Sequence, residues 1–192
     1  MAIALMKLFR CQFCLYRYSF SHTSSIHYLD GLHIIIRPVR LEDAEALWTI
    51  ARQEGVIETT MALPRLRLEQ RRQSLNTLSE NDHYVVAEKA SQVAGLAGLT
   101  VGSGRLRHSG YVFIHVAAQY QGQQIGTRLL QTLLDLADQW LLLRRVELTV
   151  LTENEGACRL YERLGFVIEG CRKMSGIAQG EIKDEWLMAR YK

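Results

Sequence analysis

The fold is decided by Tyr120-Gln-Gly-Gln-Gln-Ile-Gly-Thr127, a short loop between two apolar segments. The segment before it, Tyr111-Val-Phe-Ile-His-Val116, is rich in β-branched and aromatic residues, which is typical of a buried strand. In the segment after it, apolar residues recur every three or four positions and predict a helix with one apolar face. The residues of that face are Ile125, Leu129, Leu130, Leu133, Leu134, Ala137, Trp140 and Leu141.

A loop in this position presents unpaired backbone N–H groups at the helix N-terminus, where the helix dipole adds partial positive charge. The loop contains Gly122 and Gly126. Such a site suits a phosphate or a pyrophosphate. Taken alone, the loop leaves anion binding and an ordinary strand-to-helix turn equally open.

The composition indicates one globular domain rather than a nucleic-acid-binding or membrane protein. The chain has 192 residues, of which 48% are hydrophobic and 22% charged, and no apolar run has the length of a membrane span. Its net charge is +3. Lys7, Arg10 and Arg17 precede the first acidic residue, Asp30, so the rest of the chain balances to zero. This balance of charge argues against a nucleic-acid-binding protein, whose binding depends on neutralising phosphates.

The best candidate for a local basic patch is the set Arg65, Arg67, Arg71 and Arg72. These side chains form either a solvated helix face or a surface that faces the substrate, and the pattern favours the first.

The four cysteines give no disulfide framework. Cys11 and Cys14 form a lone C-x-x-C, and the spacing from Cys14 to His22 is shorter than zinc fingers use. We therefore expect no metal site, reduced thiols and a cytoplasmic location.

Residues 1–31 show no helical or strand period and are expected to form a poorly ordered N-terminal extension, followed by one domain over 32–192. The element order in that domain is predicted to be β-α-α-β-β-β-α-β-α-β-β, an α/β fold with a mixed sheet. The predicted strands are 33–37, 83–88, 93–101, 109–116, 145–150, 166–170 and 184–191, and the helices are 41–53, 65–79, 125–141 and 154–164.

Over residues 33–192 the chain resembles the GCN5-related N-acetyltransferases (GNAT), and in particular bacterial L-amino-acid N-acetyltransferases. The resemblance is carried by Gln121-Gly-Gln-Gln-Ile-Gly126 after a strand, by Asn154-Glu-Gly-Ala-Cys-Arg-Leu-Tyr161-Glu-Arg-Leu-Gly165-Phe166, and by Gly180-x-x-x-Asp184-x-x-x-Met188. It implies the acyl-CoA N-acyltransferase fold, with six to seven strands flanked by about four helices, and acetyl-coenzyme A (acetyl-CoA) as co-substrate.

The resemblance also implies the residues that bind acetyl-CoA. The pyrophosphate would be held by the main chain of Gln121, Gly122, Gln123, Gln124, Ile125, Gly126 and Thr127, and the pantetheine amides would pair with strand backbone at Ile114, His115 and Val116. The family normally has glycine where this chain has Gln124. Glutamine keeps the backbone N–H donor at this position, but it would be strained if the turn requires a positive φ.

The resemblance implies that Tyr161 donates a proton to the departing thiolate, as its ordinary pKa near 10 allows. Asn154 lies about two helical turns before Tyr161, so both can face the cofactor. Two simpler alternatives remain open at this stage. Tyr161 suits a half-buried core position with a satisfied hydroxyl, and Asn154 suits a helix N-cap.

The general base is not fixed by the sequence. Many relatives carry a carboxylate on the fourth strand where this chain has Tyr111. We take His108 as the first candidate, with Glu58, His115, Glu153 and a water chain as alternatives.

The predicted function is acetyl-CoA-dependent transfer of an acetyl group directly from the thioester to a primary amine of a small molecule, with amino acids among the candidates. The alternatives are a protein N-terminal or lysine acetyltransferase and a catalytically degenerate acetyl-CoA-binding regulatory module. A dinucleotide oxidoreductase is weaker, because the loop lacks G-x-G-x-x-G spacing. A homodimer is a candidate state because dimers are common in the family.

Overall fold

The computed structural model describes residues 34–60, 63 and 65–192. The predicted N-terminal extension and the Cys11–Cys14 pair lie outside these residues. Among the residues described, no group of three or more His, Cys, Asp and Glu side chains is placed to hold a metal ion.

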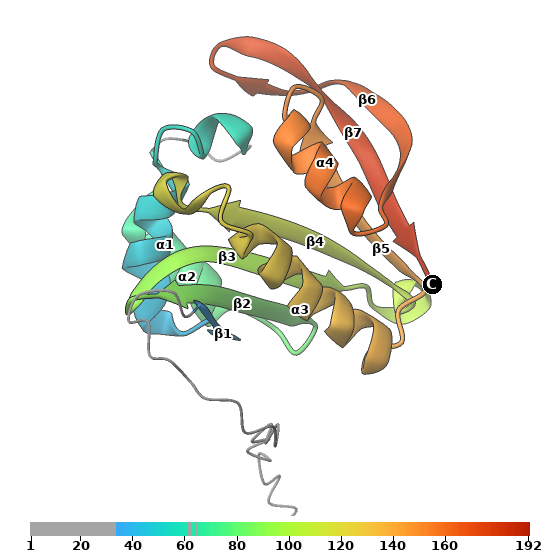
Figure 1. Ribbon diagram of the computed structural model, residues 1–192, viewed down its shortest axis with the longest axis horizontal. Helices are drawn as coiled ribbons and strands as arrows, with labels where there is room; N and C mark the ends of the chain where they lie inside the picture. The colour runs from blue at the N-terminus through green and yellow to red at the C-terminus, as the bar shows by residue number, and fades with distance from the viewer. Residues whose placement is uncertain (1–33, 61–62, 64) are drawn as a thin grey trace, which may run out of the picture.

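The core of the molecule is a seven-stranded mixed sheet in the order β1-β2-β3-β4-β5-β7-β6 (Figure 1). Every neighbouring pair is antiparallel except β4 and β5, which are parallel. The strands are β1 Ile34–Pro38, β2 Asp82–Lys89, β3 Gln92–Val101, β4 Ser109–Val116, β5 Arg145–Leu151, β6 Val167–Ala178 and β7 Glu181–Tyr191. The predicted mixed sheet and the predicted order of elements are confirmed.

The helices cover both faces of the sheet. They are α1 Ala44–Ala51, α2 Leu68–Asn76, α3 Ile125–Gln139 and α4 Glu155–Arg163. Because side chains alternate along a strand, Val112 and Ile114 of β4 pack with α3 and α4, whereas Phe113 packs with α1 on the opposite face. In Figure 1, α3 and α4 lie in front of the sheet, and α1 and α2 lie at its left-hand side.

Two predictions about the elements were wrong in detail. Trp140 is 76% exposed, because α3 ends at Gln139 and the chain turns away through Leu142, whose φ is +53°. The last two strands are longer than predicted, β6 by seven residues and β7 by three, since they continue as a hairpin to a two-residue turn at Gln179 and Gly180. Both turn residues have positive φ, as a tight hairpin turn requires.

The feature that creates the site is the divergence of β4 and β5. The two strands pair only from Ser109 beside Arg145 to Tyr111 beside Glu147. Beyond Tyr111, β4 remains paired with β3, but its other edge no longer meets β5. The Val116 carbonyl accepts from the Gln121 side chain at 3.3 Å, and the backbone before it on that edge is available to pair with a ligand.

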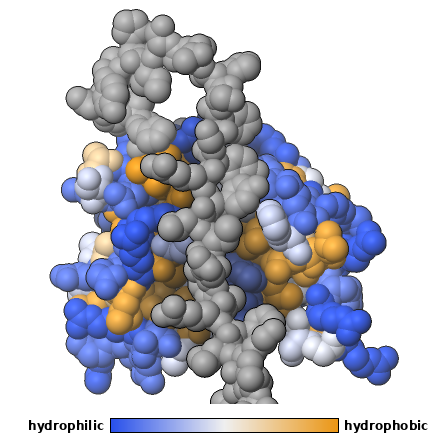
Figure 2. Space-filling view, turned by 90° about the horizontal axis from the view of Figure 1, so that it is seen from below, coloured by the Kyte–Doolittle hydropathy of each residue, from blue (hydrophilic) through white to orange (hydrophobic). Residues whose placement is uncertain are grey.

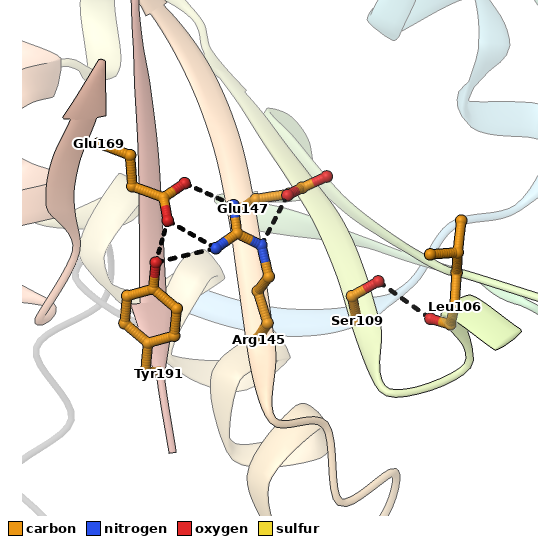
Figure 3. Close-up of polar contacts among 6 residues, drawn as sticks. All are labelled: Leu106, Ser109, Arg145, Glu147, Glu169 and Tyr191. Atoms are coloured by element: carbon orange, nitrogen blue, oxygen red, sulfur yellow. Dashed lines mark hydrogen bonds and ion pairs between the residues drawn. The ribbon is translucent and has the colours of Figure 1, made fainter.

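A polar cluster fastens the closed end of the sheet, opposite the divergence (Figure 3). Arg145 at the start of β5 donates to Glu147 at 2.9 Å, to Glu169 at 2.7 Å and to the Tyr191 hydroxyl at 2.9 Å. Tyr191 in turn donates to Glu169. These contacts join β5, β7 and the start of β6. In the same region, the Ser109 hydroxyl donates to the Leu106 carbonyl at 2.9 Å.

The surface seen from below in Figure 1 is mixed, with hydrophilic residues around separate apolar patches (Figure 2). Within the described ranges, no helix has the length and apolar character needed to cross a membrane.

Candidate active site

A cleft of about 650 Å³ lies where β4 and β5 diverge. One part of its wall is formed by the loop before α3, by the first turn of α3 and by α4. Another part is formed by side chains of β4, β5 and β7 on the opposite face of the sheet, together with residues around the short turn Ile57–Thr59. The cleft therefore reaches both faces of the sheet through the gap between the strands.

The N-terminus of α3 forms a backbone cradle in the cleft. The first N–H to bond a helix carbonyl is that of Arg128, which donates to Gln124 at 3.0 Å. The N–H groups of Ile125, Gly126 and Thr127 have no intrahelical acceptor, as expected in a first turn, and all three residues line the cleft. The unpaired donors and the helix dipole make this end of the cleft suitable for an anion.

The residue before α3 adopts a strained backbone conformation. Gln124 has φ +61° and ψ +9°, in the left-handed region that favours glycine. Gly122 has φ +73°, and a Cβ on it would meet no atom within 4 Å. The chain thus tolerates glutamine where the turn calls for glycine, at a cost of about 1 kcal/mol or more.

Glycine at position 126 lets the first turn of α3 pack closely against β4 and α4. A Cβ on Gly126 would lie 3.2 Å from Ile114 and 3.3 Å from Leu160, so only glycine fits there without displacing these side chains. Arg159 and Arg163 also line the cleft. They are four residues apart on α4 and thus share a face, where they can attract phosphates.

Asn154 and Tyr161 of the second motif both line the cleft. Asn154 caps α4, because its Oδ1 accepts from the Ala157 N–H at 3.1 Å, and this bond leaves its side-chain NH₂ available. Tyr161 is only 6% exposed and packs edge-on against Phe166. Its hydroxyl has no hydrogen-bond partner among the described residues, unlike that of a satisfied core tyrosine.

Burial raises the pKa of Tyr161, and the neighbouring Tyr111 and Cys158 add smaller effects in the same direction. The hydroxyl is therefore protonated at physiological pH and can donate. Burial also raises the pKa of the Cys158 thiol, which makes it a poor nucleophile.

The wall on the other face of the sheet carries a different set of side chains. Tyr111, Phe113 and His115 alternate along β4, Thr149 and Leu151 along β5, and Glu185 of β7 lies beside Leu151. The Tyr111 and Thr149 hydroxyls are 3.0 Å apart. Glu185 supplies the one carboxylate among the described residues that line the cleft.

His115 is neutral in this setting. Burial lowers the pKa of His115, the positive charge of Arg71 on α2 adds a smaller effect in the same direction, and together they bring it to about 4. The His115 Nδ1 and the Arg71 Nε are the buried side-chain polar atoms without a hydrogen-bond partner in the described part of the chain. Burial also lowers the pKa of Arg71, which forms no ion pair with the described residues. Arg65, Arg67 and Arg72 are exposed, but Arg65 and Arg67 precede α2, so the four arginines do not form one helix face.

The structure does not bring every predicted residue to the cleft. His108 is exposed at the start of β4, at the closed end of the sheet, where its carbonyl accepts from Arg144. Neither His108, Glu58 nor Glu153 lines the cleft, and Glu153 is paired with Lys183. Gln123 also lies outside it, since its side chain binds Lys89 and the Gln119 carbonyl. Ile114, His115, Val116, Gln121, Gly122 and Gln124 do line it.

Sequence reasoning missed Glu185, Arg159 and Arg163. The spacing of the two arginines on a predicted helix was the available signal. No sequence signal marked Glu185, because its position in the cleft depends on the register of β7 beside β5.

A model of the Acetyltransferase (GNAT) family matches residues 41–166. The match covers well over half of the chain, and the chain belongs to this family.

Similar proteins of known structure or activity agree with this assignment. The L-amino acid N-acetyltransferase AaaT of Escherichia coli (strain K12) is 28% identical over 159 residues, which cover 83% of this chain and 98% of that protein. A ribosomal-protein-alanine N-acetyltransferase from Brucella melitensis has a TM-score of 0.72 at 27% identity, covering 82% of this chain and 99% of that one. The spermidine N-acetyltransferase of Vibrio cholerae, in complex with CoA and spermine, shares the fold with a TM-score of 0.74 at 22% identity, covering 82% and 95%.

These comparisons confirm the predicted family, the fold and N-acetyltransferase activity as the reaction class. The roles of individual residues remain predictions.

Proposed function

We propose that this chain transfers the acetyl group of acetyl-CoA directly to the primary amine of a small molecule, and that amino acids are its first candidate acceptors. The observation that carries the proposal is the cleft at the divergence of β4 and β5, with a backbone cradle at one end and the buried Tyr161 hydroxyl in its wall. The thioester supplies an activated acetyl group.

Each part of the chain then has a role. The N–H groups between Gly122 and Thr127 hold the pyrophosphate, and Arg159 and Arg163 attract the remaining phosphate charge. The free edge of β4 near Ile114 and Val116 pairs with the pantetheine amides. Tyr161 donates to the sulfur as the thiolate leaves. Its raised pKa makes complete transfer uphill on its own, so the hydroxyl must regain a proton from the acetylated nitrogen.

An acceptor with a carboxylate is supported by Arg71 and His115. Arg71 does not line the cleft, but it lies close enough to His115 in the cleft wall to lower the pKa of that ring. Its guanidinium is partly buried and has no counter-ion among the described residues. A carboxylate near His115 would compensate that charge and accept a hydrogen bond from the imidazole N–H. A polyamine would add positive charge next to Arg71 instead.

The direct test is thiol release from acetyl-CoA with the common L-amino acids, spermidine, glucosamine and short peptides. We expect turnover with one or more amino acids and at least about ten-fold lower kcat/KM for the matching amino-acid amide, which lacks the carboxylate. Turnover of peptides alone would instead assign the chain to protein N-terminal acetylation. CoA binding with no thiol release in the whole panel would assign it to a regulatory module.

We also infer a cytoplasmic location and a homodimer as the state to test first. Cys158 and Cys171 are free thiols, which suits a reducing compartment. Sedimentation of the full chain tests the dimer.

A further inference from the structure

The strand pairing of β7 places a carboxylate in the cleft. Glu185 lies beside Leu151 of β5 on one side and beside Arg172 of β6 on the other. Its side chain points to the face that carries Tyr111, Phe113 and His115, and it is only 7% exposed. Burying a carboxylate costs free energy unless it has hydrogen-bond or ionic partners. The partners of Glu185 therefore help to identify its role.

The two oxygens of Glu185 are in different situations. Oε2 accepts from the Ser175 hydroxyl at 2.5 Å and from Arg172 Nη1 at 3.4 Å. Oε1 has no partner within the described chain, and it is not among the fully buried unpaired atoms. One oxygen is therefore anchored, while the other is accessible and free to accept. The side chain of Arg172 is 55% exposed, so solvent screens its charge and it compensates the negative charge of Glu185 only in part.

No other acid in the described cleft wall competes for this role. On β4, the positions that face the same side hold Tyr111, Phe113 and His115, and the pKa of His115 is too low for it to keep a proton near neutral pH. A cationic group that enters the cleft would find its complementary charge at Glu185.

We propose that Glu185 binds the ammonium group of the acceptor through Oε1 and removes one proton from it. The proposal rests on the function proposed above and names the residue that prepares the acceptor. The nitrogen, now uncharged, forms the C–N bond to the acetyl carbonyl carbon as the C–S bond breaks. Tyr161 gives its proton to the sulfur and recovers one from the new amide nitrogen. The proton on Glu185 passes to solvent, so the sum is ammonium plus thioester to amide, thiol and one proton.

The position of Glu185 also indicates which class of acceptor the cleft favours. Glu185 of β7 and His115 of β4 both line the cleft, and Arg71 of α2 lies close enough to His115 to lower the pKa of that ring. The cleft therefore has its negative group at Glu185 and a positive charge near His115. An amine that carries a carboxylate matches this distribution of charge.

The test compares Glu185→Gln with wild type, using L-amino acids as acceptors. Glutamine keeps the volume and can accept from Ser175, but it has no charge. We expect kcat/KM for the acceptor to fall by about 100-fold or more, with CoA affinity measured by calorimetry unchanged. Glu181→Gln, an exposed carboxylate at the start of the same strand, is the matched control and should behave as wild type.

A second variant keeps the test decisive if Glu185→Gln does not fold. Ser175→Ala leaves the charge but frees Oε2, and it should raise the acceptor KM by about three- to ten-fold with little change in kcat. The inference is overturned if Glu185→Gln turns over at the wild-type rate, or if it unfolds and Ser175→Ala leaves KM unchanged. Failure of the proposed function would look different, since wild type itself would then release no thiol.

Discussion

The Tyr111 hydroxyl lies 3.0 Å from the Thr149 hydroxyl and bridges β4 and β5 close to their last paired residues. The resemblance to the family leads us to expect a carboxylate at the position of Tyr111 in many members. In this chain the position ties the two strands together at the base of the cleft, while the carboxylate in the cleft comes from β7. The bridge is a neutral, exposed contact and should contribute about 1 kcal/mol at most.

Tyr111→Phe removes the bridge without changing the ring. We expect the free energy of unfolding to fall by about 1 kcal/mol or less and acetyl transfer to stay within about three-fold of wild type. Chemical denaturation and thiol-release assays measure the two effects. Thr149→Val is the matched change on the other strand. A loss of turnover as large as that of Tyr161→Phe would place Tyr111 in the catalytic machinery.

Tyr161→Phe tests the proposed proton donor. Because the hydroxyl has no partner in the described structure, its removal should leave the fold and the CoA affinity nearly unchanged. Turnover should fall by about 100-fold, the usual contribution of a positioned acid. Single-turnover kinetics with acetyl-CoA give the rate, and calorimetry gives the affinity. Unchanged turnover would remove Tyr161 from the mechanism.

Gln124→Gly tests the strain before α3. Glycine adopts the observed φ of +61° without a Cβ clash, so we expect a gain of about 1 kcal/mol, or roughly 2–4 °C in melting temperature. CoA affinity should not fall, because the donor is the main chain. Gly122→Ala, at φ +73°, is the opposite change and should cost about 1 kcal/mol. Equal melting temperatures for all three proteins would contradict this account of the turn.

His115 predicts a pH dependence of stability. Its pKa is about 4 in the folded chain, against 6.5 as the ordinary value, because burial disfavours the charged ring. As the pH falls below 6.5, the unfolded chain takes up the proton first, so the free energy of unfolding decreases. The decrease between neutral pH and about pH 5 should be roughly 2 kcal/mol. His115→Gln, followed by denaturation at several pH values, should lose most of that slope; an unchanged slope would show that His115 is not the cause.

The sequence predicted the parts of the site that depend on local pattern. The apolar period of α3 and the glycine loop before it place the helix N-terminus at the cleft, because both signals act within a few residues. The same apolar period wrongly predicted that Trp140 is buried. The chain turns at Leu142, and Leu143 is buried in place of Trp140. No glycine or proline marks that helix end.

Features of the site that depend on strand register could not be predicted from the sequence. Glu185 enters the cleft because β7 pairs with β5 and β6 in one particular register, and a shift by one residue would turn it to the other face. The unpaired state of Arg71 likewise depends on what α2 packs against. The resemblance to amino-acid-acetylating members favours His108 at the strand entrance, but His108 directly precedes β4 at the end where β4 and β5 are paired.

The central claim, that the main chain before and within the first turn of α3 grips the diphosphate of CoA, is tested most directly by amide proton–nitrogen correlation spectra of isotope-labelled protein. On addition of CoA, we expect the largest shifts at the amides from Gly122 to Thr127, and no comparable shifts with pantetheine, which lacks the diphosphate. Shifts of equal size with pantetheine, or none in this segment at saturating CoA, would contradict the account.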